Sequence, residues 1–152
     1  GVEAGVSRFV PFMSERTEVE PPSSSKLTRW RRIIREAAEQ SGRSILPELE
    51  MSGSLKCFLK SVSGAAIIPW EQKSITGIRQ VLAEFHKNEK LRCSEVSVFI
   101  GPVGGFTHDE IQLAEQSGVI PVSLGSRILR SETAGVAAAL TILYEAGEMG
   151  LP

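Results

Sequence analysis

Two strand–loop–helix passages follow one another in the second half of the chain, and they constrain the fold more than any other feature. The first runs from an apolar strand (96–100) into a glycine-rich turn (101–106) and a helix that is expected to begin with a capping box of Thr107 and Glu110. The second runs from a strand (119–124) through a tight loop (125–130) into an almost wholly apolar helix (131–146). Successive passages of this kind place both loops at the carboxyl edge of a parallel sheet, where small ligands bind. The sequence therefore predicts a cofactor pocket between these loops.

Strands and helices also alternate along the preceding residues. The pattern predicts strands over 6–13, within 44–49 around Ile45 and Leu46, and over 65–68, and helices over 27–41, 54–62 and 74–87. This alternation favours an α/β fold in which helices cover both faces of a parallel sheet.

The predicted last helix is apolar on nearly every side between Ala134 and Leu143. A helix that is hydrophobic all round must be buried, either in the core or against another subunit. We interpret it as both core and dimer surface, so a homodimer is expected.

Length and composition bound the classes of protein that are possible. The 152 residues suit one domain with one sizeable core. A hydrophobic content of 41% and a charged content of 23% are ordinary for a soluble globular protein. No apolar run approaches the roughly 20 residues that a membrane helix needs. The formal net charge of −1 argues against a protein that coats nucleic acid, although it leaves room for a local basic patch.

Cysteines and histidines give no sign of a metal or of hydrolytic chemistry. Cys57 and Cys93 have no partners at metal-ligand spacing and match no disulfide scaffold. We therefore predict reduced thiols in a cytoplasmic protein, with no metal and no membrane partner. His86 and His108 are interpreted as incidental polar residues, since no Ser-His-Asp or Cys-His arrangement can be assembled around them.

The glycine-rich turn matches neither common phosphate-binding motif. Its glycines do not follow the dinucleotide fingerprint, and the Lys-Ser/Thr pair of a P-loop is absent. A nicotinamide-dependent oxidoreductase is disfavoured for this reason. Gly101 and Gly105 instead allow backbone amides and carbonyls to approach a flat ligand without intervening side chains.

Polar groups are concentrated just before the apolar helix. Arg127, Arg130, Ser131 and Glu132 lie within a few residues of its start. In a purely structural interpretation, one arginine pairs with Glu132 and Ser131 caps the helix. Placing so many polar groups beside so apolar a helix is costly unless they face a site, so we favour a functional interpretation.

A second basic cluster lies on the predicted helix over 27–41. It can contact RNA backbone, but i,i+4 pairs of opposite charge such as Arg32 with Glu36 favour a solvated surface. Arg43, beyond the end of this helix and without an acidic neighbour in sequence, is the better candidate for RNA binding.

The two loop motifs, residues 99–106 and 124–134, together with residues 5–6, 11–16 and 36–43, carry a family resemblance. They resemble the signature motifs of the RsmE-type ribosomal RNA uridine-N3 methyltransferases of the SPOUT superfamily. The resemblance implies an α/β domain with a C-terminal trefoil knot, a homodimer, and S-adenosylmethionine as the cofactor. The substrate it implies is N3 of a uridine in small-subunit (16S) ribosomal RNA. The cofactor-binding residues that the resemblance implies are Ile68, Ile100, the turn glycines Gly101 and Gly105, Leu124, Gly125, Ile128 and Leu129.

The resemblance also defines departures. The family usually has Glu at the position of Val103 and Pro at the position of Ser126, and the loss of the carboxylate is expected to weaken substrate positioning or cofactor affinity. The family carries an N-terminal β-barrel that helps to bind RNA. Residues 1–152 are therefore expected to correspond to the methyltransferase domain, truncated at its N-terminus and without that β-barrel.

Methyl transfer to N3 requires alignment and removal of the N3 proton more than a covalent intermediate. Our hypothesis assigns Arg130 to the charge that develops on the uracil oxygens and Arg127 to an RNA phosphate. Glu132 either orients Arg130 or accepts the proton. The competing hypothesis is a non-catalytic module that keeps the fold, RNA binding and dimerisation but has lost methyl transfer.

Overall fold

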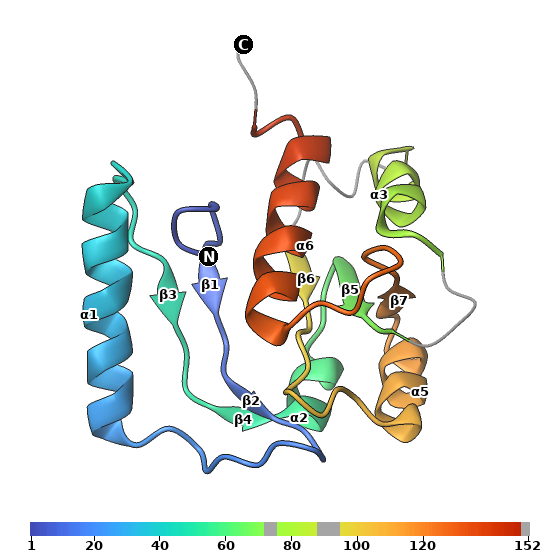
Figure 1. Cartoon of the computed structure of the whole chain (residues 1–152), viewed down its shortest axis with the longest axis horizontal. Coiled ribbons are helices and arrows are strands. Elements are labelled where there is room, and N and C mark those ends of the chain that lie inside the picture. Colours follow the sequence, from blue (N-terminus) through green and yellow to red (C-terminus); the bar gives the residue numbers. More distant parts are fainter. Residues whose placement is uncertain (72–75, 88–94, 150–152) are drawn as a thin grey trace.

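The computed structural model describes residues 1–71, 76–87 and 95–149. Short parallel strand pairs and one long helix form the first part of the chain, and a sheet with flanking helices forms the second (Figure 1). In chain order the elements are β1 (Arg8–Phe9), β2 (Phe12–Met13), α1 (Ser24–Gln40), β3 (Glu48–Leu49), β4 (Gly53–Ser54), α2 (Leu55–Lys60), β5 (Ala65–Pro69), α3 (Ile78–Lys87), β6 (Val96–Val98), α5 (His108–Gln116), β7 (Ile120–Val122) and α6 (Ser131–Glu145).

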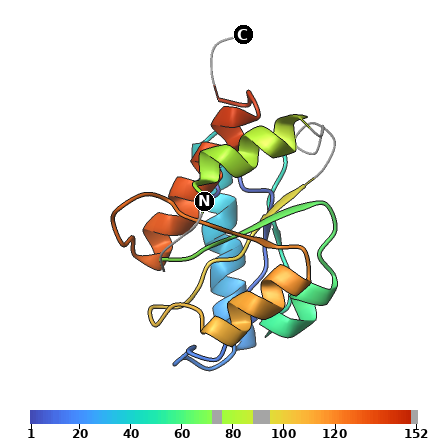
Figure 2. The ribbon, with the colours of Figure 1, turned by 90° about the vertical axis from the view of Figure 1, so that its right-hand side faces the viewer.

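The main sheet has the strand order β6-β5-β7, and both pairings are parallel. Central β5 alternates its side chains between two cores, as a strand requires. Ala66 and Ile68 pack with Phe99 and residues of α2 and α5, whereas Ala65 and Ile67 pack with α3 and α6. Figure 2 shows the sheet between these two helical layers. The predicted parallel sheet with helices on both faces is confirmed.

In the first part of the chain, α1 packs beside two pairs of short parallel strands, which together are called the ribbon below. β1 pairs with β3 and β2 with β4. A small core of Val2, Ile34 and Ala38 holds α1 against this ribbon. In Figure 1, α1 stands on the opposite side of the ribbon from the main sheet. This part of the molecule therefore lies beside the main sheet and adds no strand to it.

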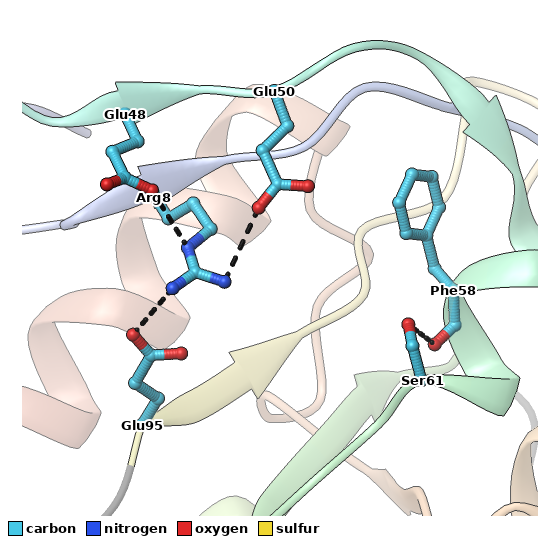
Figure 3. Close-up of polar contacts among 6 residues, drawn as sticks. All are labelled: Arg8, Glu48, Glu50, Phe58, Ser61 and Glu95. Carbon is cyan, nitrogen blue, oxygen red and sulfur yellow. Dashed lines mark hydrogen bonds and ion pairs between the residues drawn. The ribbon is translucent and has the colours of Figure 1, made fainter.

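Arg8 links the ribbon to the beginning of β6 (Figure 3). Its guanidinium lies 3.5 Å from a carboxylate oxygen of Glu48, 3.4 Å from one of Glu50 and 2.9 Å from one of Glu95. Because the Arg8 side chain is 42% exposed, solvent screens this network. The network therefore fixes the position of the ribbon relative to β6 and adds little to the stability of the fold.

Two strand predictions need correction. The predicted strand over 6–13 is divided into β1 and β2, because Pro11 between them cannot donate a ladder hydrogen bond. The strand predicted within 44–49 is β3 (Glu48–Leu49), so its centre was placed too early, at Ile45 and Leu46. These side chains are 77% and 49% exposed, and the ladder begins after Pro47, where the Glu48 N–H donates to the Ser7 carbonyl.

The helix predictions hold, with shifts at the N-termini. α1 begins earlier than predicted because the Ser23 hydroxyl accepts from the Lys26 N–H and so caps it. α3 begins at Ile78, since Gly77 forms a parallel bridge with Ser123; residues 74–75 of the predicted helix lie outside the described residues. α5 begins with the predicted capping box of Thr107 and Glu110. In the part of the chain that is described, no helix is long and apolar enough to cross a membrane.

Candidate functional site

A pocket of about 660 Å³ opens at the carboxyl edge of the main sheet. Its walls come from the segments that follow β5, β6 and β7, from the first turn of α6, and from a residue of the early chain. The lining residues are Arg16, Pro69, Trp70, Glu71, Ile100, Gly101, Pro102, Val103, Gly105, Phe106, Ser123, Leu124, Gly125, Ser126, Arg127, Ile128, Leu129, Arg130, Ser131, Glu132 and Ala134. The pocket lies where the succession of strands and loops predicts it, and its size is that of a small-molecule site.

The glycine-rich turn forms one wall of the pocket. The Gly105 N–H donates to the Pro102 carbonyl at 2.9 Å, and Gly105 adopts a φ of +67°. A Cβ at Gly101 would lie 3.1 Å from the ring of Phe106, which is buried. Glycine is therefore favoured at both positions, for conformation at Gly105 and for space at Gly101.

A side chain of α6 joins this wall to the second loop. The Ser131 hydroxyl donates to the Gly101 carbonyl at 2.7 Å, across 30 positions of the sequence. In the structural alternative Ser131 caps α6, but Arg130 occupies the N-cap position, without a side-chain hydrogen bond. The hydroxyl is instead used to hold the start of α6 against the glycine turn.

The second loop is held mainly by local contacts. The Ser123 hydroxyl donates to the Gly125 carbonyl and accepts from the Gly125 N–H, each at 3.2 Å. Gly125 has a φ of +121° with open space where a Cβ would be. Ile128 is 80% exposed, and within the described ranges no partner is found for the backbone N–H of Ile128 or Leu129. These amides are available to a ligand.

The three predicted catalytic side chains all line the pocket. Arg127, Arg130 and Glu132 are exposed, and within the described part of the chain none of them forms an ion pair. The structural alternative, in which one arginine pairs with Glu132, is therefore not the arrangement seen. The three charged groups remain free to meet a substrate.

The predicted cofactor residues fall at the pocket with one exception. Ile68 is wholly buried and packs in the core beside Phe99 and Phe106, so the assignment of Ile68 to the pocket wall needs correction. Pro69 and Trp70, which end the same strand, line the pocket in its place. The residues that do line it are Ile100, Gly101, Gly105, Leu124, Gly125, Ile128 and Leu129.

Arg43 is not among the pocket residues. Its Nη1 donates to the carbonyls of Val2 (2.9 Å) and Val6 (2.7 Å), which secures the N-terminal turn. This contact gives Arg43 a structural role. RNA binding by Arg43 stays a prediction.

Arg16, Trp70 and Glu71 are among the pocket residues that the sequence reasoning did not assign to the site. Trp70 carries a signal, since it directly follows a buried strand at the carboxyl edge, and its ring lies 5.5 Å from that of His108. Arg16 carries only the wider resemblance of residues 11–16. Among the described residues no group of His, Cys, Asp and Glu is suited to hold a metal ion, and Cys57 is an exposed free thiol; Cys93 lies outside them.

A parallel sheet with helices on both faces and a two-loop pocket at its carboxyl edge defines a ligand-binding α/β domain. Comparison with known proteins specifies the family. The chain belongs to the RNA methyltransferase domain family, whose model matches residues 1–143.

Individual relatives agree with this assignment. The chain is 37% identical over 132 residues to the ribosomal RNA small subunit methyltransferase E of Synechocystis, covering 87% of this chain and 43% of that protein. It is 32% identical over 155 residues to the enzyme of the same name from Bacillus subtilis, covering 95% and 58%. The methyltransferase E of Neisseria gonorrhoeae, solved bound to S-adenosyl methionine, superimposes with a TM-score of 0.78 at 30% identity, covering 94% and 56%. The chain thus spans about half the length of the curated relatives it matches.

Proposed function

We propose that this protein transfers a methyl group from S-adenosylmethionine to N3 of a uridine in small-subunit (16S) ribosomal RNA. The observation that carries the proposal is the hydrogen bond from the Ser131 hydroxyl to the Gly101 carbonyl, which joins the two loop motifs around one pocket. Relatives named ribosomal RNA small subunit methyltransferase E support the reaction, and the Neisseria structure bound to S-adenosyl methionine supports the cofactor.

The pocket fits such a cofactor. A nucleoside needs a flat slot and edge-on hydrogen bonds, and the two loops offer glycines at Gly101, Gly105 and Gly125 with available backbone amides at Ile128 and Leu129. The Gly101 carbonyl already accepts from Ser131, and both backbone groups of Gly125 are bonded to Ser123. We therefore assign the adenine edge to the amides of Ile128 and Leu129, with Ile100 and Leu124 as the apolar walls.

The chemistry assigned to this chain is positioning and charge stabilisation. S-adenosylmethionine, when bound, supplies an electrophilic methyl group. Arg130, at the N-cap of α6, stabilises negative charge on the uracil oxygens as N3 loses its proton. Glu132 accepts that proton or orients Arg130, and Arg127 binds an RNA phosphate, to which a guanidinium donates two hydrogen bonds.

The finer features of the fold belong to the same proposal. We infer a trefoil knot in which α6 passes through the loop after Phe99; the Ser131 contact and the packing of α6 on β6 support it. We also infer a homodimer through α6, because Val136 (38% exposed) and Tyr144 (69% exposed) leave apolar surface on that helix. Sedimentation equilibrium tests the dimer, since a monomer at micromolar concentration would contradict it. The substrate places the activity in the cytoplasm.

Two measurements test the function. Titration calorimetry with S-adenosylmethionine is expected to show binding, and small ribosomal subunits with labelled cofactor are expected to acquire a methyl group that base-resolved mapping places at N3 of one uridine. Absence of cofactor binding would favour the non-catalytic module. Methylation of another base, or of another atom of uracil, would refute the assignment to uridine N3.

A further inference from the structure

Residues 14–17 form a compact turn that docks on the start of α5. The Ser14 N–H donates to the Thr17 hydroxyl at 3.0 Å, and the Thr17 N–H donates to the Ser14 carbonyl at 3.1 Å. The Glu15 N–H donates to Oε1 of Glu110 at 2.8 Å. The Glu15 carboxylate in turn accepts from the Thr107 hydroxyl at 3.1 Å. The capping box of α5 thus also holds a segment more than ninety positions earlier in the chain.

An aromatic contact holds the same segment at its other end. The ring of Phe12 stacks on that of Phe106, with centroids 6.3 Å apart and an interplanar angle of 8°. Phe106 ends the glycine turn and is buried. The residues between Phe12 and Thr17 are therefore fixed at both ends, which places Arg16 in a defined position.

Arg16 lies along the glycine turn and reaches the pocket. Its Nη1 donates to the Gly104 carbonyl at 2.9 Å. A Cβ at Gly104 would lie 3.2 Å from the Cβ of Arg16, so the aliphatic stem runs directly over this glycine. Arg16 is the one part of the early chain among the residues that line the pocket. Its guanidinium is held by a neutral acceptor, and its charge is not consumed.

The charge balance of the pocket is opposite to that of the chain. Arg16, Arg127 and Arg130 outnumber Glu71 and Glu132 among the lining residues, whereas the whole chain carries a formal charge of −1. In the described ranges no carboxylate lies within ion-pair distance of Arg16. A guanidinium has five N–H donors, of which the Gly104 carbonyl uses one. The remaining donors can meet an anion at the rim of the pocket.

We propose that Arg16 is a substrate-positioning residue that binds a phosphate of the RNA beside the nucleotide to be methylated. The inference rests on the proposed function for the nature of the polyanion. The contact with Gly104 orients the guanidinium before RNA arrives, so that little side-chain entropy is lost on binding. The competing role is purely structural: Arg16 would brace the glycine turn for the cofactor and would not touch RNA.

The test compares Arg16→Gln and Arg16→Lys with a matched control, Arg79→Gln. Arg79 is exposed on α3, lies outside the pocket lining and loses the same charge. Binding of each protein to a small-subunit ribosomal RNA transcript is measured as a function of salt, alongside the Kd for S-adenosylmethionine and the KM and kcat on small ribosomal subunits.

Arg16→Gln is expected to weaken RNA binding about tenfold and to reduce the slope of log K against log salt by about one, as the loss of one phosphate contact requires. The Kd for S-adenosylmethionine should rise by no more than about fivefold, because the variant also loses a bracing hydrogen bond to the Gly104 carbonyl, and kcat should stay within about twofold of the original value. Arg16→Lys should restore the salt slope, because an ammonium keeps the charge, with only part of the affinity. Arg79→Gln should leave the slope unchanged.

A different pattern would overturn the proposal. If Arg16→Gln weakens cofactor binding and leaves the salt slope of RNA binding unchanged, Arg16 is only a brace. An equal change in slope for Arg79→Gln would mean that RNA senses the overall charge and no specific contact at Arg16. RNA binding is measured without catalysis. A protein that binds RNA through Arg16 and fails to methylate would therefore refute the proposed function alone.

Discussion

Both loops that build the pocket follow a parallel strand and lead into a helix, but they differ in how many contacts with distant residues hold them in place. The first, residues 100–106, is held from three sides: by Arg16 at Gly104, by Ser131 at Gly101, and by the buried ring of Phe106 at its end. The second, residues 124–130, has among the described residues only local hydrogen bonds, from Gly125 to Ser123 and from the Ala134 N–H to the Arg130 carbonyl, and its residues 125–128 are all exposed.

We infer from this difference that the two loops have separate roles in ligand binding. A wall that is already fixed loses little conformational freedom on binding, so it can define where a ligand sits. A loop with few buried contacts opens at low free-energy cost, so it can close over the ligand and carry groups to the reacting atoms. Arg127 and Arg130, to which the proposal assigns functional charges, both lie in the second loop. Each prediction below tests one side of this contrast.

The largest effect is expected at the end of the open loop. Arg130→Ala removes the cation assigned to the charge that develops on uracil, and should lower kcat by about a hundredfold to a thousandfold, the range for losing one such group. The Kd for S-adenosylmethionine should stay nearly constant, because the assigned cofactor contacts are backbone groups. Single-turnover assays and calorimetry measure the two quantities. A parallel loss of both would remove Arg130 from catalysis and would make the open loop a binding element only.

The next largest effects are expected from replacing one glycine with alanine in each of the two loops. Gly125→Ala meets no atom within 4 Å, but its φ of +121° disfavours a side chain. The strain is about 1–3 kcal/mol, and the unbraced loop can relieve it by moving. Cofactor affinity should therefore fall about tenfold while the Tm hardly changes.

Gly101→Ala is the counterpart in the braced wall. Its Cβ would lie 3.1 Å from the Phe106 ring, which is buried and cannot easily move. The Tm should drop together with the affinity. Differential scanning calorimetry on both variants decides the matter: a loss of Tm for Gly125→Ala that equals the loss for Gly101→Ala would mean that the two walls are equally rigid.

A smaller effect is expected where the walls meet. Ser131→Ala deletes the hydrogen bond to the Gly101 carbonyl, worth about 1 kcal/mol, and should weaken S-adenosylmethionine binding about fivefold. Ser131→Thr keeps the hydroxyl and serves as the matched control. Because Ser131 is not the N-cap of α6, helix content by circular dichroism should be unchanged in both variants. A loss of helix in Ser131→Ala alone would show that this hydroxyl supports α6 and does not act between the walls.

Local patterns determined which elements could be predicted from the sequence. The strand over 65–68, the capping box at Thr107 and the helix from Ser131 were predictable because hydrophobic periodicity and caps depend on neighbours in sequence. The pocket itself followed from topology, since parallel strands end at one edge. The strand predicted within 44–49 was centred too early, because pairing begins only after Pro47 and a short apolar run does not reveal where pairing begins.

The parts of the site that could not be predicted depend on contacts between distant segments. Arg16 reaches Gly104 across 88 positions, and no periodic signal marks it. The Ser131 hydroxyl has two possible kinds of partner, a helix N–H from which it can accept or a carbonyl to which it can donate, and only the position of the glycine turn decides between them. Ile68 was assigned to the wrong surface because strand alternation sends its side chain into the core and leaves the next residues for the pocket.

The smallest effect tests whether contacts near the glycine turn are sufficient to hold the first loop in place. Arg8 ties the ribbon to Glu95, just before the strand that leads into the glycine turn. Arg8→Gln should cost at most ~1 kcal/mol of unfolding free energy, because the network is exposed, and the difference should shrink as salt screens it.

Cofactor affinity should not change in Arg8→Gln, since Arg16, Ser131 and Phe106 hold the glycine turn from nearby. Arg32→Gln, which breaks a single i,i+4 pair with Glu36 on α1, is the control for loss of a surface cation. Denaturant unfolding at low and high salt, with calorimetry on both variants, gives the comparison. If Arg8→Gln weakens cofactor binding and Arg32→Gln does not, then the rigidity of the first wall is transmitted through β6 from the far part of the chain. The contrast between the two loops would then be a property of the whole fold, with the local contacts of the glycine turn insufficient to produce it.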